Sequence, residues 1–221
     1  MRQSFWSLWD REGGREHGRT QLRPGGDVSL DGSHLSVSGD GVEVELTLGE
    51  AEAIESVCPS GERGYGWTRK RAGLDVTGSV RTPERRIEVA ALGVDDESAG
   101  YHQRHTSWSW SAGVGRADDG RAVAWNLVEG INDPPRDSER AIWLDGQPEE
   151  PSPVVFSGLD EIELADGEKL IFTNEAERER DDNLIVFRSR YRRRFGTVAG
   201  TLGGAKLSEG FGVMERHEAL W

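Results

Sequence analysis

The stretch Tyr101–Gly130, YHQRHTSWSWSAGVGRADDGRAVAWNLVEG, shows the clearest strand alternation in the chain and holds three of its eight tryptophans. From Thr106 onward the even positions are Thr, Trp, Trp, Ala and Val, whereas the odd positions 105–111 are one histidine and three serines. Because side chains alternate across a strand, one face is predicted to be aromatic and the other small and hydroxylated. The segment Arg116–Gly120 then predicts a turn and Ala122–Val128 a returning strand, which together make a β-hairpin at the heart of a barrel or sandwich.

The composition favours one substantial core. A chain of 221 residues is long enough for a full domain with a partial second one. The mean hydropathy is −0.64, and no apolar run approaches the roughly 18 residues that a transmembrane helix needs. The N-terminal run Met1–Trp9 lacks the continuous apolar segment of a secretory signal. With a single cysteine, Cys58, which excludes an internal disulfide, these features predict a cytoplasmic protein.

Charge and motifs exclude several classes of function. The net charge of −13 argues against nucleic acid as a partner, because phosphate binding depends on clustered cations. The sequence has no glycine-rich phosphate loop, no dinucleotide fingerprint and no Gly-x-Ser-x-Gly elbow. One cysteine also excludes a thiolate zinc site. We therefore expect no cofactor and no bound metal.

Short strands are predicted along the rest of the chain. Asp27–Val57 alternates with period two around the turn dipeptides Asp31-Gly32 and Asp40-Gly41, which are strong hairpin signals. A succession of short strands from Trp67 to the C-terminus predicts an all-β, antiparallel barrel or sandwich. Asp95 is the expected cap of a single helical turn.

Three segments are expected from these patterns. Residues 1–26 are predicted to be weakly structured, because glycines and a proline interrupt them. Residues 27–64 are predicted to form a partial first β-domain, and residues 65–221 a complete β-barrel. The unpaired strand edges of a partial domain favour aggregation, and a homodimer would cover them.

A set of polar side chains remains as the candidate site: His102, His105, Glu129, Asp133, Glu215 and His217. Glu215 and His217 are two residues apart in a predicted strand and therefore share one face. A carboxylate beside an imidazole in an apolar barrel would make a proton-transfer pair. Two histidines and a carboxylate could instead ligate a metal, and a third interpretation is a hydrogen-bonded plug without function.

The tryptophans Trp108, Trp110 and Trp125 allow two interpretations. On the inner face of a barrel they could line an apolar ligand cavity, but large aromatic side chains more often fill a core. The basic run Arg188–Arg194 follows the acidic run Glu175–Asp182 closely, which predicts a solvated hairpin with internal charge balance.

Several motifs together resemble a known family. They are GYGWTRKRAGLDVTGSV (64–80), SAGYHQRHTSWSWSAGVG (98–115), WNLVEGINDPP (125–135), SERAIWLDG (138–146), FGTVAGTL (195–202) and GVMERHEALW (212–221). The sequence resembles a bacterial domain-of-unknown-function family that is similar to the carotenoid hydratase (hydroxyneurosporene synthase) and AttH-like group. The resemblance covers residues 60–221 well and residues 20–60 loosely.

This resemblance implies a tandem of two lipocalin-like (calycin) β-barrels, with residues 65–221 as the second. Members of that family are usually longer and have a complete first barrel, so the first barrel here is expected to be truncated or reduced to a few strands packed on the second. Relatives include carotenoid hydratases and natural-product cyclases that act on large apolar molecules. None of their catalytic residues can be matched to a position here.

Two hypotheses follow, with a filled structural barrel as a third. The first is a binding module for a hydrophobic small molecule, with His102, Trp108, Trp110, Trp125 and Glu129 as ligand-binding residues. The second is an enzyme in which Glu215 and either His105 or His217 transfer protons to an alkene or polyene during hydration, isomerisation or cyclisation. An enzyme requires a titratable pair that points into an accessible apolar cavity, whereas a carrier requires only the cavity.

Overall fold

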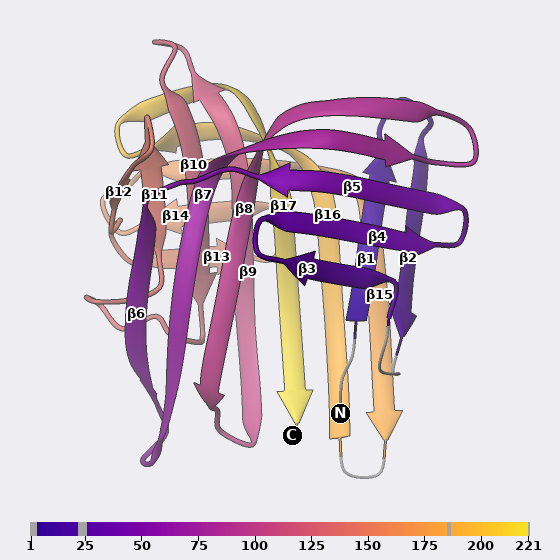
Figure 1. Ribbon diagram of the computed structural model, residues 1–221. Helices are drawn as coiled ribbons and strands as arrows, with labels where there is room; N and C mark the ends of the chain where they lie inside the picture. The colour runs from indigo at the N-terminus through magenta and orange to yellow at the C-terminus, as the bar shows by residue number, and fades with distance from the viewer. Residues whose placement is uncertain (1–3, 22–25, 185–186, 221) are drawn as a thin grey trace. The chain divides into compact units, whose positions relative to one another are not determined.

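A computed structural model describes residues 4–21, 26–184 and 187–220 of the chain. The described residues form seventeen β-strands and no helix, and every strand pair with a defined register is antiparallel (Figure 1). The predicted all-β, antiparallel class is therefore confirmed. The helical turn predicted at Asp95 is wrong, because this residue lies within a continuous strand.

The strands fall into three sheets. The two-stranded sheet consists of β1 (Ser4–Asp10) and β2 (Arg15–Gln21). A second sheet has the order β3 (Val28–Asp31), β4 (His34–Gly39), β5 (Val42–Leu48), β7 (Gly64–Arg81), β6 (Ala53–Ser60), and β8 (Arg86–Tyr101) also pairs with β7. The third sheet has nine strands, in the order β12 (Gln147–Glu149), β11 (Ala141–Leu144), β10 (Ala122–Glu129), β9 (His105–Ala117), β17 (Ala205–Leu220), β16 (Phe187–Leu202), β15 (Lys169–Leu184), β14 (Glu161–Leu164), β13 (Val154–Ser157).

The chain divides into two compact units. Unit 1 contains Met1–Glu50 and Leu74–Gly93, and unit 2 contains Ala51–Gly73 and Val94–Trp221. The long strands β7 and β8 each begin in one unit and end in the other. The units therefore do not follow the boundaries at residues 27, 64 and 65 that the sequence predicts, because turn signals mark strand ends and cannot show where one strand serves two cores.

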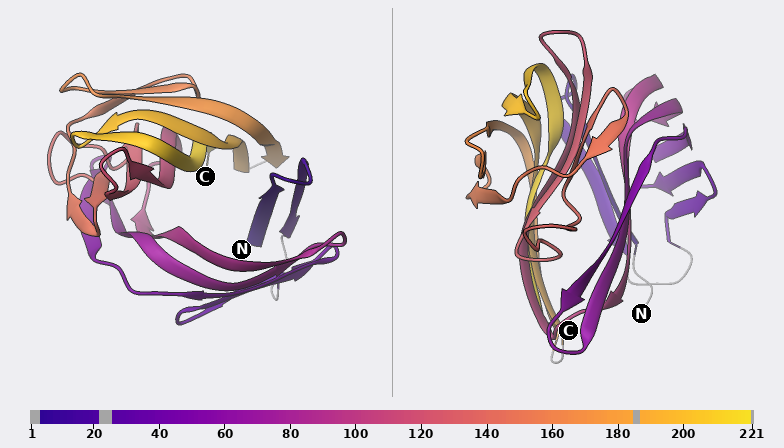
Figure 2. Two further views of the ribbon diagram at one scale, coloured as in Figure 1. Left: turned by 90° about the horizontal axis from the view of Figure 1, so that it is seen from above. Right: turned by 90° about the vertical axis from the view of Figure 1, so that its left-hand side faces the viewer.

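Unit 1 contains a hairpin where weak structure is predicted. Strands β1 and β2 pair over their whole length, from Ser4 opposite Gln21 to Asp10 opposite Arg15 (Figure 2, indigo). Trp6 on β1 packs into a small core with valines of β4, β5 and β7, and this burial stabilises a segment whose glycines suggested disorder. The prediction for residues 1–26 is wrong for 4–21, and its remaining positions 1–3 and 22–25 lie outside the described residues.

Unit 2 contains the predicted central hairpin. Strands β9 and β10 pair from Ala122 opposite Arg116 to Glu129 opposite Ser109, which confirms the alternation derived from the sequence. The serine face of β9 lies against the main core, where Trp125 is 0% exposed and its Nε1 donates a hydrogen bond to Ser111 Oγ at 3.0 Å. Gly113 leaves room for this indole, since an added Cβ would stand 2.2 Å from Trp125 Cζ2.

Candidate functional site

A pocket of about 320 Å³ lies within unit 2 and includes the aromatic face of β9 in its wall. This volume is at the lower end of the roughly 300–1,000 Å³ that small-molecule sites occupy. Its lining residues come from β7, β8, β9, β16, β17 and the segments that follow β8 and β10: Lys70, Asp96, Ser98, His102, Thr106, Trp108, Trp110, Ile131, Asn132, Glu139, Arg193 and Glu215. The pocket therefore combines two tryptophans with several ionisable groups.

Strand parity and register place the two tryptophans of the wall. Trp108 and Trp110 are two residues apart on β9, so both point to the same face, opposite His217 and Glu215 of β17. The Trp110 indole is fixed by a hydrogen bond from its Nε1 to Asn126 Oδ1 at 2.8 Å. The Trp108 ring packs 4.3 Å, centre to centre, from the His217 ring. Both aromatic side chains are thus held in place and stay partly accessible.

Glu215 lies between Trp110 of β9 and Arg193 of β16, directly opposite each of them across the sheet. Arg193 of β16 lies directly opposite Glu215, and its Nε donates a hydrogen bond to Glu215 Oε2 at 2.8 Å, with a second bond from Nη2. The guanidinium carbon of Arg193 is 5.9 Å from the centre of the Trp110 ring, within the range of a cation–π contact. His217 Nδ1 is 3.7 Å from the other oxygen of Glu215. A charged row therefore crosses the sheet beside the aromatic wall.

Glu215 is held in its ionised form. Burial by itself would raise the pKa of Glu215, but the nearby His217 imidazole and the positive charge and hydrogen bonds of Arg193 outweigh it. The pKa of this carboxyl group therefore lies below its ordinary value. Glu215 consequently supplies a fixed negative charge that accepts hydrogen bonds at neutral pH.

A second charged cluster joins the pocket from β7 and β8. Lys70 is one of three lysines in the chain, and its side chain is only 3% exposed. Its Nζ lies 2.5 Å from Asp96 Oδ1 and 3.6 Å from Glu139 Oε2. Asn132 Nδ2 also donates a hydrogen bond to Glu139 Oε2, at 3.0 Å. One buried ammonium thus faces two carboxyl groups.

The pKa of Glu139 is displaced in the opposite direction from that of Glu215. Burial raises the pKa of Glu139 above its ordinary value, and the opposing influence of Lys70 and Asn132 is the smaller one. The two glutamates of one pocket therefore have pKa values displaced in opposite directions. Such pairs are typical of sites where one group carries a proton and the other does not.

The raised pKa of Glu139 predicts a pH-dependent stability. A carboxyl group with a raised pKa in the folded state stabilises the fold fully below its unfolded-state value, 4.5 for glutamate, and this contribution is lost as the pH rises through the folded-state pKa. We expect the free energy of unfolding of the wild type, relative to Glu139→Gln, to fall over this interval. Urea titrations of both proteins across the interval measure it, and parallel curves would contradict the raised pKa.

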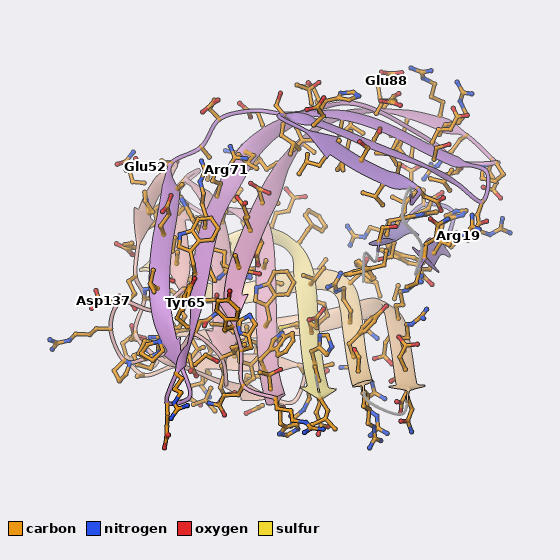
Figure 3. The ribbon with its side chains drawn as sticks, turned by 60° about the horizontal axis from the view of Figure 1, so that its bottom comes forward. Arg19, Glu52, Tyr65, Arg71, Glu88 and Asp137 are labelled. Atoms are coloured by element: carbon orange, nitrogen blue, oxygen red, sulfur yellow. The ribbon has the colours of Figure 1, made fainter. Side chains whose placement is uncertain are left out.

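The segment Gly130–Arg140 is the loop that carries Asn132 and Glu139 into the pocket (Figure 3, Asp137 labelled). The Arg140 side chain is 1% exposed and donates to the carbonyl oxygens of Asp133, at 3.1 Å, and Pro134, at 2.8 Å. Asn132 adopts a φ of 49°, in the left-handed region that asparagine tolerates better than most residues. Gly66 of β7 faces it, where an added Cβ would stand 2.6 Å from Asn132 Oδ1. The hydrogen bonds of Arg140 and the close contact with Gly66 therefore hold the loop in one conformation.

Arg140→Met is expected to loosen this loop. The change leaves two carbonyl groups without their donor, and each buried unsatisfied group costs about 1–3 kcal/mol. Hydrogen exchange of the amides in residues 131–139 should accelerate, while amides of β15 and β16 keep their protection. Uniform acceleration across unit 2 would show instead that Arg140 supports the whole fold.

Four of the predicted site residues line this pocket, namely His102, Trp108, Trp110 and Glu215. His217 lies next to it, against Trp108 and Glu215, and its Nε2 shares a hydrogen bond with Ser189 Oγ at 2.9 Å.

The other predicted site residues lie elsewhere. Trp125 is in the core on the opposite face of the sheet, so it cannot form the pocket wall. Glu129 Oε2 accepts a hydrogen bond from the Phe156 amide at 3.0 Å, outside the pocket. His105 has a side chain that is 59% exposed and forms an ion pair with Glu218 at 3.0 Å. Asp133 accepts a hydrogen bond from the Gly130 amide at 2.7 Å, which is a turn contact.

Eight lining residues were not predicted from the sequence. Three of them are Ser98, Thr106 and Ile131, and the other five have charged or amide side chains: Lys70, Asp96, Asn132, Glu139 and Arg193. Lys70 could have been found, because parity places it on the same face of its predicted strand as Thr68 and Ala72, both buried. Asp96 was assigned to a helical turn. Arg193 was counted with its charge-balanced neighbours.

Those neighbours do behave as predicted. Across β15 and β16, Arg190 pairs with Asp181 at 2.8 Å, Arg192 with Glu179, and Arg194 with Glu177 at 2.6 Å. A larger hollow of about 620 Å³ lies over these ion pairs. Its described lining residues include no tryptophan, and four of its five arginines already pair with carboxylates, so its chemistry is that of a solvated surface. Parity separates Arg193 from Arg192 and Arg194 and turns it into the smaller pocket.

Metal binding finds no geometric support in the described part of the chain. No group of three or more His, Cys, Asp or Glu side chains there is arranged to hold an ion. The same residues contain no helix that is long and apolar enough to cross a bilayer.

The fold and the pocket together define an antiparallel, lipocalin-like β-protein. The chain belongs to the family called Domain of unknown function (DUF2804), which it matches over residues 19–221. No curated protein matches the sequence. The match to this family over residues 19–221 confirms the predicted resemblance to a domain-of-unknown-function family.

Two solved structures share the fold. An AttH-like protein from Nitrosomonas europaea superposes with a TM-score of 0.56 at 13% identity, covering 96% of this chain and 80% of that one. Kievitone hydratase from Nectria haematococca superposes with a TM-score of 0.50 at 10% identity, covering 99% of this chain and 79% of that one. At such identities the likeness concerns the fold, and it confirms the lipocalin-like class.

Proposed function

We propose that unit 2 binds a small molecule with an apolar, aromatic or unsaturated body and one polar group. The observation that supports this proposal is that Trp108 and Trp110 line the same 320 Å³ pocket as Lys70, Glu139, Arg193 and Glu215. Ligand sites typically combine an apolar wall with a few polar groups that fix orientation.

The two tryptophans would supply the binding energy. Both indoles are already partly covered by the protein, so a ligand gains from burying their remaining accessible area together with its own apolar surface, at about 25 cal/mol per Å². The charged side chains are already hydrogen-bonded to one another, so the ligand would not have to neutralise all of them. A volume of 320 Å³ suits a molecule of two or three rings.

Trp108→Ala is expected to weaken the binding of such a molecule. With 2-ethylnaphthalene as the probe, equilibrium dialysis should show a roughly tenfold rise in Kd, which corresponds to about 1.4 kcal/mol of lost aromatic contact. Trp67→Ala is the matched control, because Trp67 lies on β7 in the same unit but outside the pocket. Equal affinities in all three proteins, or no saturable binding to the wild type, would refute the proposal.

An enzyme that transfers protons to an unsaturated substrate is the second candidate. The observation that favours it is the presence in one pocket of two glutamates whose pKa values are displaced in opposite directions, Glu139 upward and Glu215 downward, with His217 beside Glu215. Hydration of an alkene needs an acid that protonates one carbon and a base that takes a proton from the attacking water. One structural relative is a hydratase by name.

Isotope incorporation tests the second candidate. Incubation with kievitone in ¹⁸O-labelled water should add one labelled oxygen to the compound, and Glu215→Gln should abolish the addition while the compound still binds. Binding without incorporation by the wild type would favour the carrier over the hydratase.

A further inference from the structure

With His102 counted as neutral, the charges that line the pocket do not balance if every other group is ionised. Two cations, Lys70 and Arg193, face three carboxyl groups. Arg193 is engaged by Glu215 through two hydrogen bonds, and Lys70 is closer to Asp96, at 2.5 Å, than to Glu139, at 3.6 Å. Glu139 therefore only shares a cation with Asp96, and it lies at the longer of the two Lys70 distances.

Burial decides the protonation of that extra group. The Glu139 side chain is 5% exposed, whereas the Asp96 side chain is 32% exposed. An isolated charge is costly to bury, and a carboxyl group in such a position neutralises by keeping its proton. The charged or titratable groups around Glu139 come from five strands and the segment after β8: Cys58 of β6, Lys70 of β7, Asp96 of β8, Arg193 of β16, Glu215 of β17 and His102.

The contacts of Glu139 also leave one oxygen for a ligand. Among the described residues, Lys70 and Asn132 both approach Oε2. Glu139 itself lines the pocket, so Oε1 is the atom through which it can meet a bound molecule. A protonated carboxyl group offers one O–H donor.

We propose that Glu139 is held as a neutral acid and donates a hydrogen bond to an acceptor oxygen of the ligand. This inference rests on the proposed binding function and deepens it by naming the ligand class, an uncharged aromatic molecule that carries a carbonyl or similar acceptor. A ligand with an ammonium group would be the better partner only if Glu139 were ionised.

Three naphthalenes of nearly equal size separate these cases. They are 2-ethylnaphthalene, which has no polar group, 2-acetylnaphthalene, which has an acceptor oxygen, and 1-(2-naphthyl)ethylamine, which is a cation at neutral pH. We expect 2-acetylnaphthalene to bind the wild type about tenfold more tightly than either of the others, as the loss of one hydrogen bond in a buried site predicts.

Substitutions at Glu139 connect this preference to one proton. Glu139→Gln keeps a donor that does not titrate, so the preference should persist and become independent of pH. Glu139→Leu removes the donor, so the preference should disappear while 2-ethylnaphthalene still binds. In the wild type the preference is present at low pH and is lost as the pH rises through the pKa of Glu139. The exposed Glu163→Gln is the matched control and should behave as the wild type does.

Each result supports or overturns the inference. Equal binding of the ketone and the hydrocarbon, or tighter binding of the amine, would overturn it and leave the pocket as a binding site. Failure of all three probes to bind would overturn both the inference and the proposed function. Persistence of a pH-dependent preference in Glu139→Gln would assign the proton to another group and equally overturn it.

Discussion

Lys70→Met is expected to lower the free energy of unfolding by about 3 kcal/mol, the lower end of the range for breaking a buried ion pair. The substitution removes the cation that lies 2.5 Å from Asp96 and leaves that carboxylate without its partner. The lower end of the range applies because 32% of the Asp96 side chain remains exposed to solvent. Urea denaturation at neutral pH measures the change.

Two further variants make this prediction specific. Lys169→Met removes a half-exposed lysine that pairs with Glu161 and Glu163, and exposed pairs contribute about 0–1 kcal/mol. The double variant Lys70→Met/Asp96→Asn removes both charges, so it should recover part of the lost stability. If Lys70→Met loses no more stability than Lys169→Met, Lys70 does not form a buried ion pair with Asp96.

Trp125→Ala is the second large change, and it is expected to cost about 3–5 kcal/mol of stability, as truncation of a buried tryptophan does. The indole is fully buried over Gly113, and its hydrogen bond to Ser111 would also be lost. Because Trp125 lies in the core and outside the pocket, probe affinity measured below the unfolding transition should change little.

Trp108→Ala provides the opposite pattern. Its side chain is partly accessible in the pocket wall, so its removal should lower affinity more than stability. Measuring both quantities for both variants separates a core tryptophan from a pocket tryptophan. A loss of affinity without loss of stability in Trp125→Ala would contradict the placement of that residue.

The part of the site that the sequence could predict is the part that lies on adjacent strands. Period-two alternation places Trp108 and Trp110 on one face, and the same reasoning places Glu215 with His217. Both pairs lie as parity requires, opposite each other across β9 and β17. Local periodicity was sufficient to predict which side chains share a face of the sheet, because the register between β9 and β17 is fixed.

The rest of the site depends on contacts between distant segments. Lys70, Asp96 and Glu139 come from β7, β8 and a loop after β10, and no local pattern states that these three meet. For the same reason parity could assign Trp125 to a face but could not say which face is the core. The hairpin at residues 4–21 follows the same rule. Trp6 is buried against valines of later strands, and no pattern within the segment itself predicts that contact.

Binding of a small molecule against Trp108 and Trp110 should be visible in the spectra of the two indoles. Indole N–H resonances of assigned ¹⁵N-labelled protein, followed during titration with 2-acetylnaphthalene, test it most directly. We expect saturable shifts of the Trp108 and Trp110 resonances, while those of Trp125 and Trp143, both buried in cores of the same unit, stay in place. Unshifted Trp108 and Trp110 signals, or larger shifts at Trp125 and Trp143, would contradict it.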